Sequence, residues 1–229
     1  MHADAVGKVF TIGSETVRAV DGVSLTVDRG EMVVLVGDSG SGKSTLLNMI
    51  GGLDRPDSGA LTVLDTDVRT ASDRDLARLR LARVGVVFQD FNLVKDLTLA
   101  ENVALPLEGM GTARREARDA AHAALARVGL ENLGARFPAE VSGGQQQRAA
   151  IARAVVGERD LILADEPTGS LDSRTGREIM ELLAGLRADG TTVILSTHNP
   201  ANMDYGSQIV ELKDGRRISR DRAEENAEC

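Results

Sequence analysis

Residues 37–45 read GDSGSGKST, and this stretch decides the fold. Its spacing, G-x-x-x-x-G-K-[ST], is the pattern of a loop whose backbone N–H groups surround phosphate oxygens. The apolar run MVVLV precedes the loop and KSTLLNMI, which reads as a helix, follows it, so strand, loop and helix occur in the order that the motif requires. A chance turn rich in Gly and Ser would not have these neighbours. The predicted phosphate-binding loop consists of Gly37, Asp38, Ser39, Gly40, Ser41, Gly42, Lys43, Ser44 and Thr45.

Two side chains of the loop are expected to contact a nucleotide and its metal. Lys43 supplies a point charge to the terminal phosphates, and the hydroxyl of Ser44 binds Mg²⁺. The N-terminus of the following helix adds a favourable dipole. Asp38 brings an acid into the loop, but it occupies an x position, where the motif uses the backbone. We therefore expect its carboxylate to point away from the phosphates.

The composition is that of an ordinary soluble protein. The 229 residues are 42% hydrophobic and 27% charged, and the net charge of −8 argues against broad nucleic-acid binding, which needs a basic surface. Cys229 is the only cysteine, so no disulfide can form within the chain. No apolar run is long enough to cross a bilayer, and the N-terminus lacks the pattern of a secretion signal. A cytoplasmic location is the expectation.

Strands and helices alternate along most of the chain, which favours a mostly parallel sheet. Apolar strands are predicted at residues 32–36, 84–89, 161–166 and 192–196, a half-buried strand at 23–27, a helix at about 174–187 and a terminal hairpin that turns at Asp214 and Gly215. The acidic end, residues 221–229, is expected to be frayed. Residues 91–156 have helical periodicity instead, with apolar positions at Ala117, Ala121, Ala124, Leu125 and Val128.

Polar side chains end several of these strands. Because open α/β sheets bind ligands at the carboxyl edge, Asp165 is a candidate Mg²⁺ ligand and Glu166 a candidate general base that activates water. Gln89 could bind Mg²⁺ or order the water without adding charge, and His198 could contact a γ-phosphate. Taken alone, each has a plain reading as a strand cap or an exposed loop residue. The phosphate loop favours the functional one.

The stretch VSGGQQQR contains a second candidate anion-binding site. Ser142, Gly143, Gly144 and Gln145 fit the S-x-x-Q capping box at a helix start. Serine, two glycines and a helix N-terminus also make an anion site. Two candidate phosphate-binding sites in one compact chain suggest that two copies share a nucleotide.

Taken together, these motifs resemble the ATP-binding-cassette (ABC) transporter ATPases over nearly the whole chain. In the family's order they are Walker A at residues 37–45, the Q-loop at Gln89, the signature at residues 141–145, Walker B at residues 161–166, the D-loop and the switch His198. Val141 replaces the commoner leucine at the start of the signature. The D-loop consists of Ser170, Leu171 and Asp172. The family places an aromatic residue against adenine, and the matching position is Phe10, where many relatives have tyrosine and where ordinary strand packing is the alternative.

The resemblance implies a P-loop NTPase fold of the α/β class, with a mostly parallel sheet and an N-terminal antiparallel β part. It divides the chain into a nucleotide-binding core, residues 1–90 and 157–229, and an inserted helical subdomain, residues 91–156. The family sandwiches two ATP molecules with Mg²⁺ between two copies, the signature acting in trans, and hydrolyses them to drive a membrane subunit. Closer matches such as FQDFNLVKDLTLAENVALPL resemble the macrolide-exporter and lipoprotein-releasing branch. That branch implies a separate permease of the macrolide-exporter or FtsX type and a place on the inner face of the cell membrane.

Three other functions are compatible with parts of this pattern. DNA-repair ATPases of the superfamily insert a coiled coil for which the interval between Lys43 and Ser142 is too short, and ribosomal members carry two cassettes. Importer ATPases often add a C-terminal regulatory domain, whereas this sequence ends soon after its hairpin. A regulatory partner that binds ATP with little hydrolysis is disfavoured by the presence of Glu166 and His198, and it stays open.

Overall fold

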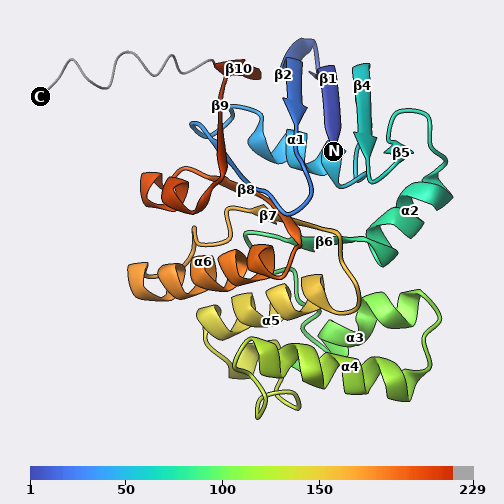
Figure 1. The fold of residues 1–229 in the computed structure, drawn as a ribbon, viewed down its shortest axis with the longest axis vertical. Coiled ribbons are helices and arrows are strands. Elements are labelled where there is room, and N and C mark those ends of the chain that lie inside the picture. The colour runs from blue at the N-terminus through green and yellow to red at the C-terminus, as the bar shows by residue number, and fades with distance from the viewer. Residues whose placement is uncertain (219–229) are drawn as a thin grey trace, which may run out of the picture.

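The N-terminal part of the chain forms a four-stranded antiparallel sheet. The structure is a computed structural model and describes residues 1–218. The strand order is β2-β1-β4-β5 (Figure 1). Its members are β1 (His2–Ile12), β2 (Glu15–Thr26), β4 (Ser58–Val63) and β5 (Thr66–Asp67). Val23 and Leu25 on β2 are buried and alternate with exposed residues, as the period-two pattern predicts.

The central sheet has six strands in the order β10-β9-β3-β8-β7-β6. All neighbours are parallel except β9 and β10, which form the predicted hairpin. Its turn residues Asp214 and Gly215 both have positive φ, 49° and 77°. The strands are β3 (Met32–Val36), β6 (Val84–Val87), β7 (Leu161–Asp165), β8 (Thr192–Thr197), β9 (Gln208–Lys213) and β10 (Arg216–Ile218).

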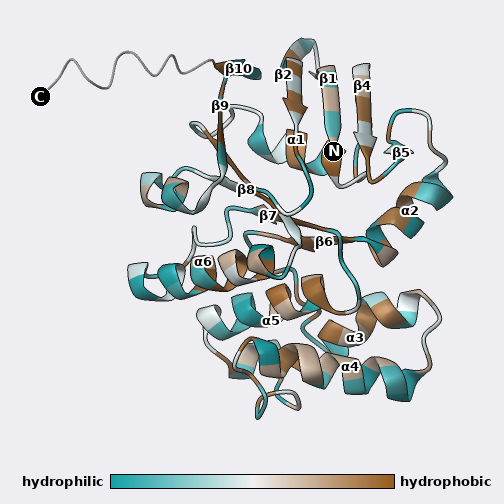
Figure 2. Ribbon diagram, in the orientation of Figure 1, coloured by the Kyte–Doolittle hydropathy of each residue, from teal (hydrophilic) through white to brown (hydrophobic). Residues whose placement is uncertain are grey.

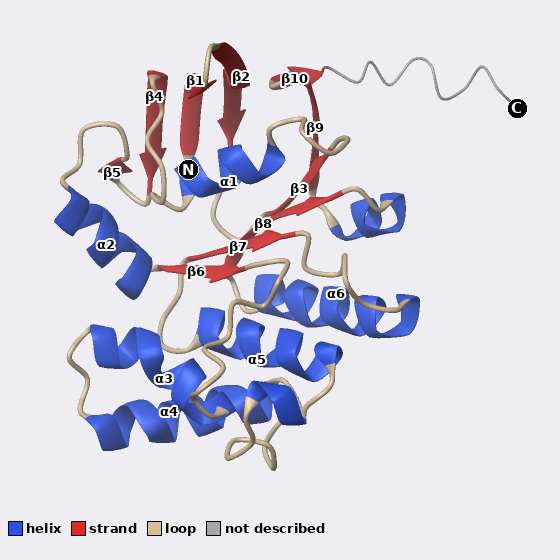
Figure 3. Cartoon of the chain, turned by 180° about the vertical axis from the view of Figure 1, so that it is seen from behind, coloured by secondary structure: helices blue, strands red, loops and turns tan. Residues whose placement is uncertain are grey.

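The helices lie on both sides of this sheet. Figure 3 shows α1 and α2 on the side of the antiparallel sheet, and α3, α4, α5 and α6 on the other side. Three of them, α3, α4 and α5, follow β6 and precede β7. The bounds are α1 (Lys43–Ile50), α2 (Asp73–Ala82), α3 (Leu99–Gly109), α4 (Arg114–Arg127), α5 (Gly143–Val155) and α6 (Ser173–Ala188), with short 3₁₀ helices at Pro138–Glu140 and Pro200–Tyr205.

The central sheet separates two hydrophobic clusters. Alternation along β3 sends Val33 and Leu35 to the cluster under the antiparallel sheet, and Met32 and Val34 to the cluster shared with α3, α4, α5 and α6. Figure 2 shows apolar residues along the central strands and on α5, with hydrophilic residues over much of α4 and α6. The helices after β6 are therefore held against the sheet by a continuous apolar core.

The predicted elements are present, with four corrected boundaries. The strand expected at 23–27 is part of β2, which begins at Glu15 and ends at Thr26. The strand expected at 84–89 ends at Val87, because the pairing of β6 with β7 ends there and β6 has no neighbour on its other side. The strand expected at 161–166 ends at Asp165, because Glu166 turns into a left-handed conformation. The strand expected at 192–196 runs one residue further, to Thr197.

The helical predictions agree with the structure within the residues that it describes. All five apolar positions predicted on one face in the region of α4 are buried there. The predicted frayed end and Cys229 lie outside residues 1–218. None of the helices within residues 1–218 is long and apolar enough to cross a bilayer.

Candidate functional site

A cleft of ≈ 960 Å³ opens at the carboxyl edge of the parallel strands. Its volume is in the range of small-molecule sites, roughly 300–1,000 Å³. Seven separate segments line it: Phe10 on β1, residues 17–19 on β2, residues 38–45 of the phosphate loop, Gln89 after β6, Glu166 after β7, His198 after β8 and Asp214 in the hairpin turn. The strand order places β3, β8, β7 and β6 side by side, so residues that are far apart in the sequence meet at one edge.

The glycines of the loop are required by neighbours from other parts of the fold. Gly42 ends the loop with φ 101°, and a Cβ there would lie 2.2 Å from the carbonyl oxygen of Ala19. A Cβ on Gly37 would lie 2.2 Å from the carbonyl oxygen of Leu212. No side chain fits at these distances. The backbones of β2 and β9 can approach the loop this closely only because both positions are glycine.

The terminal hairpin braces the phosphate loop. The N–H of Gly215 donates to the carbonyl oxygen of Ser41 at 3.1 Å, and the N–H of Asp21 donates to the carbonyl oxygen of Gly215 at 2.8 Å. Asp21 also accepts from Arg216, whose hydrogen bond is the main cause of a lowered pKa of the Asp21 carboxyl. The sequence analysis predicted the turn but not this contact, because nothing local indicates which segment a hairpin will touch.

Lys43 folds back over the loop that precedes it. Its Nζ donates to the carbonyl oxygens of Gly37 at 2.6 Å and Asp38 at 2.9 Å, and the residue is only 6% exposed. The ammonium is thus held against the loop by two of its carbonyl oxygens. Asp38 itself is exposed, and among residues 1–218 its carboxylate has no hydrogen-bond partner, so the loop uses only its backbone.

Asp165 lies next to Ser44, which lines the cleft. The Ser44 hydroxyl donates to Asp165 Oδ1 at 3.0 Å, and the Ser196 hydroxyl donates to the same oxygen at 2.5 Å. Ser196 lies on β8 directly beside Asp165 in the sheet register. It fixes the orientation of the carboxylate, and the sequence analysis missed it because a serine inside an apolar strand gives no such signal.

The backbone of Glu166 is strained. Its φ is 47°, which is unusual for a residue with a side chain and costs about 1–3 kcal/mol unless the surroundings hold it. Its N–H donates to Ser196, at 3.1 Å to the hydroxyl and 3.2 Å to the carbonyl oxygen. The carboxylate, 13% exposed, places Oε2 2.9 Å from Nδ1 of His198. The turn thus aims Glu166 at His198 and the cleft.

Phe10 and Gln89 both line the cleft. Phe10 is 38% exposed, pairs with Val17 across β1 and β2, and has Lys8 Nζ 5.4 Å from its ring centroid. Burial opposes the charge of Lys8, but ion pairs with Asp54 and Asp57 raise its pKa, so this cation stays charged beside the ring. Gln89 is exposed in the loop after β6.

The donors around Asp165 fit a magnesium ion only together with phosphate oxygens. Within residues 1–218 no group of three or more His, Cys, Asp or Glu side chains gathers to enclose a metal. Ser44 and Asp165 are in contact, and Gln89 lines the same cleft. Mg²⁺ usually keeps several waters and is bound through one or two carboxylates together with substrate phosphates. The donor set present here suits that mode of binding.

The signature residues do not reach the cleft of their own chain. Ser142 caps α5, accepting from the N–H of Gln145 at 3.3 Å, while its own N–H donates to Gln145 Oε1 at 2.9 Å. Ser142 and Gly143 are exposed, and none of the four signature residues lines the cleft. Within one chain, the predicted anion site at the start of α5 is therefore separate from the phosphate loop.

The predicted D-loop also caps a helix, which the sequence analysis did not predict. Ser170 is exposed, and Leu171 packs against the apolar core. Asp172 is the N-cap of α6: it accepts from the N–H groups of Arg174 and Thr175 and from the Thr175 hydroxyl at 2.7 Å. The Thr175 hydroxyl and amide, followed by the Arg174 amide, lower the pKa of Asp172.

Comparisons with known proteins agree with this geometry. The sequence pattern of the family described as "ABC transporter" matches residues 20–169. The uncharacterized ABC transporter ATP-binding protein YknY of Bacillus subtilis is 45% identical, with 92% of this chain and 91% of that protein covered. The macrolide export ATP-binding/permease protein MacB of Burkholderia pseudomallei is also 45% identical over 92% of this chain, but this chain spans only 32% of it.

A solved structure has the same fold. The dimeric post-hydrolysis structure of the ATP-binding cassette MJ0796 bound to ADP and Pi has a TM-score of 0.89 and 41% sequence identity. It covers 95% of this chain and 96% of its own. A second dimeric structure, of MJ0796 as a bacterial ABC transporter cassette, matches equally well.

Proposed function

The chain belongs to the ABC transporter ATP-binding family and is an ATPase, and from that premise we propose that two copies enclose two ATP molecules to drive a separate permease. One observation carries the proposal. Ser142 is exposed at the N-terminus of α5, with its capping box formed, yet it lies outside the cleft that contains Lys43. A helix N-terminus can bind an anion. Because this one lies outside the cleft of its own chain, it is suited to bind the nucleotide of another copy.

In this proposal the cleft binds ATP through the phosphate loop and Mg²⁺ through three oxygens. The loop amides of residues 37–45 surround the phosphates, and Lys43 exchanges its carbonyl partners for phosphate oxygens. Ser44, Asp165 and Gln89 would hold Mg²⁺, which neutralises charge on the phosphates when it is bound. The contact between Ser44 and Asp165 supports the pairing.

Hydrolysis is assigned to the pair formed by Glu166 and His198. Glu166 accepts a proton from the attacking water as general base, and His198 holds both Glu166 and the γ-phosphate. Ser142, Gly143, Gly144 and Gln145 would complete the site from the second copy. Its D-loop, residues 170–172, would touch His198 in the closed dimer. ATP closes the dimer and hydrolysis reopens it.

The base of the nucleotide is assigned to Phe10. The ring is partly exposed and lines the cleft, and stacking needs a π face rather than a hydroxyl. We propose that Asp38 keeps its carboxylate in solvent when ATP is bound. A structure with nucleotide in which this carboxylate touches a phosphate would contradict that assignment.

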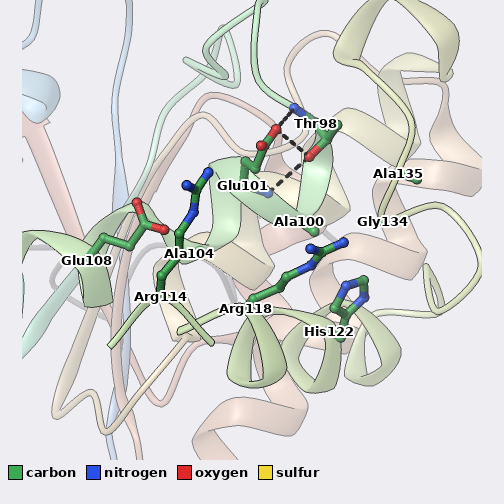
Figure 4. Close-up of a pocket in the computed structure, with 10 residues that line it drawn as sticks. All are labelled: Thr98, Ala100, Glu101, Ala104, Glu108, Arg114, Arg118, His122, Gly134 and Ala135. Carbon is green, nitrogen blue, oxygen red and sulfur yellow. Dashed lines mark hydrogen bonds between the residues drawn. The ribbon is translucent and has the colours of Figure 1, made fainter. Parts of the chain in front are cut away.

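A surface pocket on the helical part offers a site for the permease. It has a volume of ≈ 160 Å³ between α3 and α4, and its small walls come from Ala100, Ala104 and Gly134. In Figure 4 the side chains of Arg114 and Arg118 rise from α4 toward α3. This arrangement suits a small apolar side chain flanked by an acidic residue.

Acids on α3 also border this pocket and offset part of the charge of its arginines. Glu101 is engaged by Thr98, whose N–H and hydroxyl donate to it and lower its pKa, with nearby Arg114 and Arg118 adding to the shift. Glu108 is a second acid that lines the pocket, and His122 lines it from α4. We propose that a cytoplasmic segment of the permease binds here, with a small apolar side chain in the pocket and one acidic residue next to Arg118.

The permease is proposed to be of the macrolide-exporter or FtsX type. The support is the 45% identity to MacB, a protein named as both ATP-binding and permease, of which this chain matches about a third. In this arrangement the ATPase lies on the inner face of the cell membrane, bound through its permease, and acts in export or force transmission. The product of a neighbouring reading frame with a few membrane helices and a large external domain is the candidate. Its addition should stimulate ATP hydrolysis, and Arg118→Glu should weaken the stimulation.

Mixing two defective variants tests the shared site. Lys43→Ala and Ser142→Ala each damage both sites of a homodimer. In a mixed dimer one site carries both defects, whereas the other has an intact Lys43 loop and an intact signature. The mixture should therefore hydrolyse ATP faster than either variant alone. If each chain used its own signature, mixing would recover nothing.

A further inference from the structure

The loop after Gln89 has two consecutive residues in the left-handed backbone region. Phe91 has φ 61° and Asn92 has φ 48°. Asparagine tolerates this conformation, but it is rare for a bulky residue such as phenylalanine. A pair of such residues persists only where surrounding groups hold the backbone in place. The question is which group holds this loop.

Arg153 of α5 makes the holding contact. One terminal nitrogen of its guanidinium donates to the carbonyl oxygen of Phe91 at 2.8 Å, and the other donates to the carbonyl oxygen of Asn92. Burial lowers the pKa of Arg153, and within residues 1–218 no carboxylate lies at ion-pair distance from it. The planar guanidinium holds two N–H donors at a fixed spacing, one for each carbonyl oxygen, whereas a lysine ammonium has a single nitrogen.

The same loop touches the other end of α5. A Cβ on Gly143 would lie 3.8 Å from Cζ of Phe91, an ordinary van der Waals distance, so the phenyl ring reaches the start of this helix. Gly143 and Arg153 are about 15 Å apart along α5 at 1.5 Å per residue. The loop is thus attached to α5 at two separated points, and it must move with that helix.

We propose that Arg153 is a positioning residue that fixes the loop after Gln89 to the helix that begins at the signature. It makes the placement of Gln89 in its own cleft depend on the orientation of Ser142 toward the second copy. This inference rests on the proposed function, because it concerns the roles given there to Gln89 and Ser142.

A double-mutant cycle tests the proposal in the full chain. The kcat and the KM for ATP are measured for Gln89→Ala, Arg153→Gln and the double variant. Arg153→Gln should lower kcat about 10- to 100-fold, the effect of a misplaced group, while KM changes less than about twofold because the phosphate loop is untouched. The double variant should be no slower than Gln89→Ala, because the two changes remove one effect.

Arg159 offers a matched control. Burial also lowers its pKa, and it donates to the backbone carbonyl of Leu81, at the opposite edge of the sheet from the cleft. Arg159→Gln should cost thermal stability as Arg153→Gln does, yet leave kcat unchanged. Arg153→Lys keeps the charge and reaches one carbonyl, so its kcat should fall less. It replaces Arg153→Gln in the cycle if that variant does not fold.

The outcomes separate this inference from the proposed function. If Gln89→Ala leaves kcat unchanged, the role of Gln89 is wrong and the inference fails with it. If Gln89→Ala lowers kcat but the double variant shows the product of the two losses, Arg153 does not act through Gln89. A loss of kcat in Arg159→Gln as large as in Arg153→Gln would show general destabilisation. In these last two cases only the inference is overturned.

Discussion

Nδ1 of His198 lies 2.9 Å from Oε2 of Glu166, although 31 residues separate them in the chain. The contact follows from the sheet: β7 and β8 are parallel neighbours, and Asp165 pairs with Ser196 at their ends. Glu166 and His198 each follow one of these strands. The distance suits a hydrogen bond from a protonated Nδ1 to the carboxylate.

Glu166→Gln should retain ATP binding and lose turnover. The amide keeps the size of the side chain but cannot accept the proton of the attacking water. A fall of at least about 100-fold in kcat is expected for loss of a general base. The variant should also remain dimeric in ATP, as measured by light scattering after gel filtration. Hydrolysis at the parental rate would show that Glu166 is not the base.

His198→Ala should impair turnover by removing the partner of Glu166. His198→Asn retains an amide donor near the position of Nδ1, so it should keep more activity than the alanine variant. Both are compared in steady-state ATPase assays with the KM for ATP, which should change little because Lys43 and its loop are intact. Normal activity of His198→Ala would remove the histidine from the mechanism.

Gly42→Ala should abolish ATP binding, because its Cβ would overlap the carbonyl oxygen of Ala19 at 2.2 Å. Gly185→Ala is the control: Gly185 is exposed in α6, and a Cβ there meets no atom within 4 Å. Replacing a helical glycine by alanine should stabilise the fold by about 0.5–1 kcal/mol without changing ATP hydrolysis. Calorimetric titration with ATP and thermal unfolding measure both variants. Full ATP affinity in Gly42→Ala would contradict the loop geometry.

Asp172→Ala should reduce stability in a pH-dependent way. The hydrogen bond from the Thr175 hydroxyl, with the amides of α6, lowers the pKa of Asp172 in the folded state, so the ionised form stabilises the fold. Its contribution is fully present above the unfolded pKa of about 3.9 and is lost as the pH falls through the lower folded value. The difference in unfolding temperature between the parent and Asp172→Ala should therefore be larger at pH 7 than at acid pH.

Asp172→Asn distinguishes the helix-capping role of Asp172 from its proposed role in the D-loop of the dimer. Asparagine caps helices as well as aspartate does, so stability at pH 7 should largely be retained. If kcat still falls, the charge of Asp172 acts in the dimer. If Asp172→Ala were as stable as the parent at pH 7, the capping contact would have no energetic role.

Local patterns in the sequence predicted much of the candidate site. The glycine spacing of residues 37–45 predicted a loop between β3 and α1, and the structure has it there. Apolar runs ending in Asp165 and Glu166, or before His198, predicted strand ends at one edge. The sequence also predicted the capping box at Ser142, because its two hydrogen bonds join residues that are only three positions apart.

Contacts between distant segments could not be predicted in the same way. Ser196 orients Asp165, Gly215 braces Ser41, and Arg153 holds the loop after Gln89. Each partner looks ordinary in its local sequence: a serine in an apolar strand, a turn glycine and an arginine on a helix. Their functions depend on which strands become neighbours.

The sequence by itself determined the family, the loop predicted to bind phosphate and the candidate residues at the strand ends, because these depend on short-range spacing and backbone chemistry. The tertiary structure alone decided that Glu166 faces His198, that Ser44 meets Asp165 and that Ser142 lies outside its own cleft. The physical reason is that the order of parallel strands is set by burial of both sheet faces, a property of the whole chain.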